Sequence, residues 1–141
     1  MPSSAEHRVK YQANRQLLDT GNNGTPLSTL DGCWAAIVAF YAALHLVDRV
    51  AARINLHPTP PGAHAARLRF VSSQHRAIFA DYNDLKVASE IARYGTLNQF
   101  NRAFPGTTVQ DILVNQKLVA IENYVNLIFN PPAPPAAATG S

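Results

Sequence analysis

The stretch CWAAIVAFYAALHLV, from Cys33 to Val47, constrains the fold more than any other part of this chain. A transmembrane helix needs about 20 predominantly apolar residues, whereas this run is shorter and is interrupted by His45. Its apolar side chains recur at helical and not at alternating spacing. A helix that is apolar on most sides is buried on most sides. We therefore expect the central helix of a water-soluble helical protein, and no membrane partner.

The rest of the composition is that of an ordinary globular chain. Its 141 residues correspond to one domain. The single cysteine, Cys33, excludes an intramolecular disulfide and a four-cysteine zinc site. The formal charge of +3 permits a nucleic-acid partner without singling one out, because the basic residues are scattered. The N-terminus lacks the apolar core of a signal peptide, so we expect a cytoplasmic protein.

Helical spacing recurs along the chain, and no stretch alternates for long enough to predict a strand. The predicted fold class is all-α: an up-and-down bundle of four to five helices formed by residues 1–130. The proline- and alanine-rich tail, residues 131–141, is expected to be disordered. Residues 95–106 are expected to form a loop with at most one helical turn. The helices are predicted at residues 4–19, 29–55, 63–72, 75–94 and 107–129.

The predicted inner face of each helix follows from its apolar spacing. The first helix would bury Val9, Ala13 and Leu17. The second would bury a stripe that includes Trp34 and His45, with a second apolar face that extends to Ile54. The remaining inner positions are Ala65, Leu68 and Val71; then Ile78, Tyr82, Leu85, Ser89 and Ala92; then Val109, Ile112, Leu113, Gln116, Ala120 and Leu127.

His45 and Asp48 are the polar residues of the central helix that most need an explanation. A spacing of three places them on the same helical face. Burying an imidazole and a carboxylate costs free energy unless both are hydrogen-bonded. One interpretation is a structural pair that is satisfied by a carbonyl or a tyrosine. The other is that the pair lines a pocket, together with Tyr41 one turn earlier.

His64 and Arg67 follow a proline-rich turn and also share one helical face. A helix N-terminus beside an arginine suits an anion, because free N–H groups and the helix dipole both favour negative charge. The alternatives are a solvated first turn, or an Arg67–Asp48 salt bridge between the two helices. Because the connection is short, His45, Asp48, His64 and Arg67 could meet in space.

The sequence offers few residues for a metal centre or for nucleophilic catalysis. His45, Asp48, His57 and His64 offer nitrogen and oxygen ligands, but their spacing matches no local zinc motif. Cys33 has no evident base nearby and is typical of a small buried hydrophobe. We therefore expect no metal and no cofactor.

The order of several motifs resembles the HEPN superfamily of small α-helical domains. These motifs are WAAIVAFYAALHLVDRV, LHP with its proline-rich turn, HAAR, and YNDLKVASEIARY, which together cover residues 30–94. The resemblance implies an up-and-down helical bundle that often forms a homodimer. It also implies activity on RNA, since many members are ribonuclease toxins of toxin–antitoxin or defence systems.

The resemblance further implies a catalytic pair with an arginine four to six residues before a histidine. Arg69 and His75 have five residues between them and match this pattern. The histidine would then carry out acid–base chemistry on the 2′-hydroxyl and the leaving oxygen, and the arginine would stabilise the phosphorane charge, without a metal. In that case His64 and Arg67 would hold phosphate.

Three functions therefore stay open at the level of sequence, the third being a purely structural domain of a larger assembly. The first is an RNA-directed HEPN-like domain, in its enzymatic form a metal-independent endoribonuclease with Arg69 and His75 as the catalytic pair. The second is a non-catalytic dimeric module that binds a partner protein or a small anionic ligand, such as a nucleotide, at His45, Asp48, His64 and Arg67. The expected partners are RNA or a nucleotide, an antitoxin or another protein, and a second copy of the chain.

Overall fold

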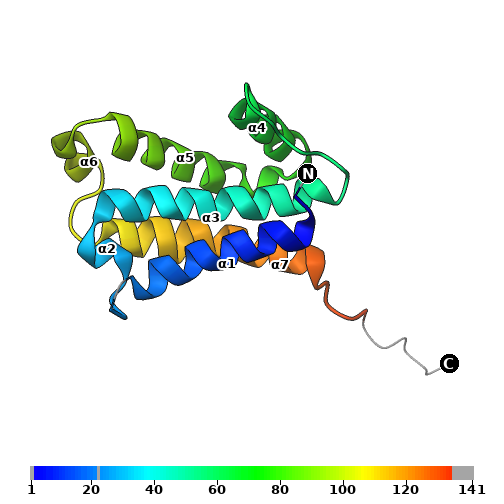
Figure 1. Ribbon diagram of the computed structural model, residues 1–141, viewed down its shortest axis with the longest axis horizontal. Coiled ribbons are helices and arrows are strands. Elements are labelled where there is room, and N and C mark those ends of the chain that lie inside the picture. The colour runs from blue at the N-terminus through cyan, green and yellow to red at the C-terminus, as the bar shows by residue number, and fades with distance from the viewer. Residues whose placement is uncertain (1, 22, 135–141) are drawn as a thin grey trace.

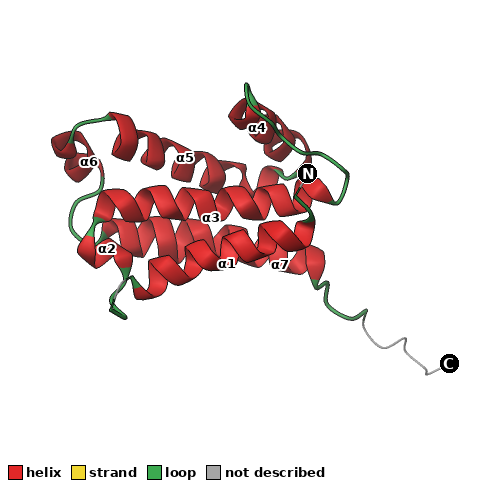
Figure 2. Ribbon diagram, viewed as in Figure 1, coloured by secondary structure: helices red, strands yellow, loops and turns green. Residues whose placement is uncertain are grey.

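A computed structural model describes residues 2–21 and 23–134 of the chain (Figure 1). Within these ranges the protein is all-helical and contains no strand (Figure 2). Its seven α-helices exceed the predicted four to five. The elements are α1 (Ser4–Thr20), α2 (Leu27–Leu30), α3 (Gly32–Ala52), α4 (Ala63–Gln74), the 3-10 turn η1 (Arg76–Ile78), α5 (Phe79–Tyr94), α6 (Leu97–Ala103), the π-helical segment η2 (Val109–Leu118) and α7 (Val119–Phe129).

The apolar run around residue 40 forms α3, which lies at the centre of the protein as the sequence predicts. It contacts α1, α5, η2 and α7, and these long segments run in alternating directions along the molecule (Figure 1). Among the described residues, α3 is the one helix long and apolar enough to cross a bilayer. However, 72% of its most apolar window is buried inside the protein. This burial is what a core helix requires.

The predicted start and end of the central helix are wrong by a few residues. Asp31 has extended backbone angles and separates α2 from α3. Its side chain accepts a hydrogen bond from the Trp34 amide at 3.0 Å, which caps α3. Trp34 itself is 49% exposed, and Ile54, which lies beyond the end of α3, is 58% exposed. Neither residue belongs to the core.

The predicted inner face of α1 is wrong at Val9 and Ala13, whereas Leu17 is partly buried and packs against the core as expected. Val9 is 65% exposed, and Ala13 is exposed as well. The helix instead turns His7 and Leu18 inward, and Tyr11 packs against the core. Hydrogen bonds explain how this less apolar face is tolerated: His7 pairs with His45, and the Tyr11 hydroxyl donates to Glu122.

The connection after α3 ends in Gly62, whose φ of +85° is a left-handed conformation that suits glycine. The helix α4 begins at the next residue and extends two residues further than predicted. Val71 is buried as expected, but Ala65 is exposed. The segment predicted as a loop contains α6, which begins with a capping box between Thr96 and Gln99.

The buried stripe of α5 is confirmed for Tyr82, Leu85 and Ser89. The last predicted helix is observed as η2 followed directly by α7. Its Leu127 is 57% exposed, and Gln116 is exposed, so these two positions of the predicted inner face are wrong. Residues 131–134 have no regular structure, and the rest of the predicted tail lies outside the described residues.

Candidate functional site

The polar side chains of α3 face the start of α1 and the start of α4. Because α1 and α3 are antiparallel, the first turn of α1 lies beside the last turns of α3 (Figure 1). A hydrogen bond of 2.9 Å from the Ser4 hydroxyl to the Arg49 carbonyl joins these ends. The arrangement brings His7 to His45 and places Asp48, one turn further along α3, within reach of α4.

Asp48 and Arg67 form a bidentate ion pair between α3 and α4. The Arg67 Nε donates to Oδ1 of Asp48 at 2.8 Å, and Nη2 donates to Oδ2 at 3.0 Å. The Asp48 side chain is only 5% exposed and the Arg67 side chain 11%. Removing one partner of a buried pair leaves an uncompensated charge, which typically costs about 3–5 kcal/mol. The salt bridge given above as an alternative is therefore present, and it holds α4 against α3.

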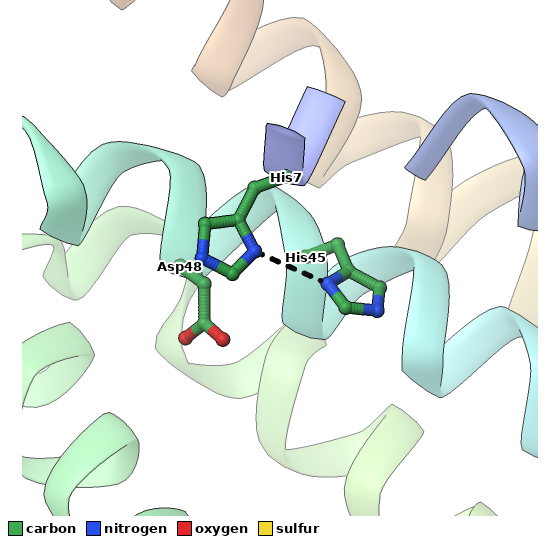
Figure 3. Close-up of side chains that lie close together, drawn as sticks. All are labelled: His7, His45 and Asp48. Carbon is green, nitrogen blue, oxygen red and sulfur yellow. Dashed lines mark hydrogen bonds between the residues drawn. The ribbon is translucent and has the colours of Figure 1, made fainter. Parts of the chain in front are cut away.

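His7 and His45 are in contact through their Nδ1 atoms, which lie 3.3 Å apart (Figure 3). Burial, and to a lesser extent the neighbouring His7, lower the pKa of His45 to about 4. Burial also lowers the pKa of His7, against the opposing effect of the Asp48 carboxylate. Both imidazoles are therefore neutral at pH 7, so each ring has one N–H and one nitrogen lone pair, and one of the two Nδ1 atoms accepts the hydrogen bond that the other donates.

A cavity of about 480 Å³ opens between α3 and the start of α4. His45, His64 and Arg67 line it, as the sequence predicts, and Tyr41 also contributes. No side chain caps α4, and its first intrahelical bond is donated by Ala66 to Gly62. The three preceding amides of α4 therefore have no intrahelical acceptor.

The exposed ring of His64 packs against Phe40, with 5.8 Å between the ring centroids. Although the residue is largely exposed, the partial burial of the imidazole against Phe40 and, second, the nearby Arg67 charge lower the pKa of His64. His64 is therefore also neutral at pH 7, and the charges of Asp48 and Arg67 cancel. The cavity thus offers hydrogen-bond donors without a large positive charge.

Arg69 and His75 lie apart from this cavity. The His75 Nδ1 is 2.7 Å from the Tyr124 hydroxyl, and its ring packs edge-on against Phe70 and Tyr124. Burial and the Arg53 charge lower the pKa of His75. Arg69 is exposed, and its guanidinium makes no hydrogen bond or ion pair with the described residues. The structure therefore brings His64 and Arg67 to the cavity and shows no contact between Arg69 and His75.

His7 is the site residue that sequence reasoning missed. It is 7% exposed and lies four residues before Tyr11 and eleven before Leu18, on the observed inner face of α1. This spacing is helical and was present in the sequence as a signal. It was hidden because Val9, Ala13 and Leu17 form a more apolar face.

Acidification is predicted to destabilise the fold through His45. Its folded pKa of about 4 lies below the ordinary value of 6.5, so the unfolded chain binds more protons between these two values. The contribution of His45 is complete above pH 6.5 and is lost as the pH falls towards 4. Urea unfolding in chelator should show a loss of roughly 2 kcal/mol from this group between pH 7 and pH 5. His45→Gln should lose correspondingly less, and equal losses in the two proteins would refute this assignment.

Comparison with models of protein families gave no match, and comparison with curated proteins and with solved structures gave no significant one.

Proposed function

We propose that this chain is a ligand-binding module, and that its cavity between α3 and α4 binds a small anionic ligand such as a phosphate or a nucleotide. The observation that carries the proposal is the convergence of donors on one cavity. Arg67 lines it, and Nη1 of this guanidinium has no hydrogen-bond partner among the described residues. The uncapped amides of Ala63, His64 and Ala65 and the positive end of the α4 dipole lie at the same wall.

The charge balance of the site indicates what kind of anion it takes. Asp48 already compensates Arg67, and His45 and His64 are neutral at pH 7. Recognition then depends on directed hydrogen bonds and not on a strong positive field. This favours a compact anion with one phosphate or carboxylate over a highly charged polymer at this cavity.

The ligand proposal predicts saturable binding of inorganic phosphate and AMP by isothermal titration, with chelator present throughout. A hydrogen bond to a charged group contributes about 1.5–3 kcal/mol, so His64→Ala should weaken binding about tenfold or more. His64 is exposed, and its loss should leave the fold intact. Arg69→Ala, on the same helix but apart from the cavity, is the matched control and should bind as wild type does. Equal affinities of His64→Ala and wild type, or no binding of any nucleotide in a panel, would contradict the proposal.

A second candidate function is that of a HEPN-like ribonuclease, and the hydrogen bonding of His75 favours it. The Tyr124 hydroxyl contacts Nδ1 and thereby fixes the ring, while Nε2 makes no hydrogen bond with the described residues. A neutral imidazole with one nitrogen oriented and the other free is suited to general acid–base catalysis. Arg69, exposed on α4, would supply the charge that stabilises the phosphorane.

The ribonuclease proposal predicts metal-independent cleavage of RNA by the wild-type chain. His75→Asn and Arg69→Ala should each abolish it, and Tyr124→Phe should reduce it because the ring loses its orienting bond. Melting temperatures of all variants check that the fold persists. Cleavage that survives in His75→Asn or Arg69→Ala, or a wild type that leaves RNA intact, would overturn the assignment.

The remaining partners stay predictions. The end of α2, the start of α3, the end of α5 and the start of α6 carry exposed apolar side chains suited to a homodimer or to a protein partner, and these segments lie at the end of the molecule away from α4 (Figure 1). The side chains are Leu30, Trp34, Tyr94 and Leu97. An antitoxin or another protein would compete with a second copy of the chain for this end.

A further inference from the structure

His7, His45 and Asp48 form a cluster of three side chains, of types that can bind a metal, in the interior of the helical bundle. One ligand atom from each residue lies within 4.8 Å of the other two. Figure 3 shows the two imidazole rings facing each other with the Asp48 carboxylate beside them. The ligand-binding function proposed above makes no use of His7.

The spacing of the two imidazoles is that of neighbouring ligands around one ion. Zinc–nitrogen bonds are about 2.0–2.1 Å long, so two nitrogens of a tetrahedral site lie about 3.4 Å apart. The Nδ1 atoms of His7 and His45 are 3.3 Å apart. A hydrogen bond between the two rings has a similar length, so the distance alone does not distinguish a hydrogen-bonded pair from a metal site. Titration with a metal ion distinguishes them.

The side chains are also in the chemical state that a metal requires. A ligand imidazole must be neutral, and burial holds both histidines in that form at pH 7. The Asp48 carboxylate contributes a hard anionic ligand, and its bidentate bonds to Arg67 fix its orientation while further oxygen lone pairs remain. In metal sites a second group usually forms a hydrogen bond to the ligand side chain and thereby orients it. Here the Arg67 guanidinium donates to the Asp48 carboxylate and orients it in the same way.

We propose that His7, His45 and Asp48 bind one divalent transition-metal ion of the Zn²⁺ class. The arrangement follows the rule for metal sites in helical bundles, where ligands three residues apart on one helix combine with ligands from a facing helix. Two imidazoles and one carboxylate suit Zn²⁺, Co²⁺ or Ni²⁺ and not Ca²⁺ or Mg²⁺, which prefer oxygen ligands.

The cluster also borders the cavity between α3 and α4. His45 belongs both to the cluster and to the wall of the 480 Å³ cavity. Three protein ligands leave the fourth tetrahedral position for water or for a ligand that enters from the cavity, as in catalytic and not structural zinc sites. An anion in the cavity and a metal ion at its wall would each raise the affinity of the protein for the other, although each can bind alone.

The test titrates chelator-treated wild-type protein with Zn²⁺ alone by calorimetry, in the absence of phosphate, and records the visible spectrum with Co²⁺. One ion per chain should bind, and Co²⁺ should give the intense bands of a four-coordinate site. His7→Gln and His45→Gln should each lower the affinity at least about tenfold, since changes even behind metal ligands cost about 10–100-fold. Circular dichroism confirms that the variants are folded.

His75→Asn is the matched control, because this histidine contacts Phe70 and Tyr124 instead of the cluster. It should bind Zn²⁺ as wild type does. Absence of stoichiometric binding to wild type, unchanged affinity in His7→Gln, or an equal loss in His75→Asn would overturn the metal site. Because the phosphate titration is performed in chelator, either proposal can fail while the other stands.

Discussion

The structure depends on the burial of a carboxylate in a helix that is otherwise almost entirely apolar. Asp48 is 4% exposed near the end of α3, and Arg67 of α4 compensates its charge. An uncompensated charge at that depth would be costly, so α4 must approach α3 in one register. The ion pair therefore positions α4 as well as stabilising it, and the place of the cavity follows from it.

The ion pair between Asp48 and Arg67 also affects the protonation of the histidines near it. With Arg67 compensated, the nearby imidazoles are governed mainly by burial, and His7, His45 and His64 are neutral at pH 7. Neutral rings serve as hydrogen-bond donors to an anion or as ligands to a metal. Protonated rings would repel both Arg67 and a metal ion. The proposed cavity and the proposed metal site are thus two uses of one buried polar region.

Much of this architecture follows from periodicity in the sequence. The burial of α3 was predictable because this helix is apolar on most sides, and the Tyr82, Leu85 and Ser89 stripe of α5 was predictable from its helical spacing. The observed face of α1 has helical spacing too, but the more apolar face of Val9, Ala13 and Leu17 competes with it in the sequence. The buried polar side chains of α1 are satisfied by partners far along the chain, 38 residues away for His7 and 111 for Tyr11.

The polar site was partly predictable for the same physical reason. Equal spacing placed His45 with Asp48, and His64 with Arg67, and a short connection indicated that the two pairs could meet. A buried carboxylate needs a cation, which made the bond from Arg67 to Asp48 a reasonable expectation. The contribution of α1 depends on tertiary packing, so local spacing could not predict the partner of His45.

The most direct test of the account compares wild type, Arg67→Met and the double variant Asp48→Leu/Arg67→Met by their free energies of unfolding in urea. Arg67→Met should destabilise the protein by about 3–5 kcal/mol, because it leaves the Asp48 carboxylate buried and unpaired. The double variant Asp48→Leu/Arg67→Met should recover most of that loss. A cost of only about 0–1 kcal/mol for Arg67→Met, as for an exposed ion pair, or a double variant no more stable than the single one, would contradict the central role of this interaction.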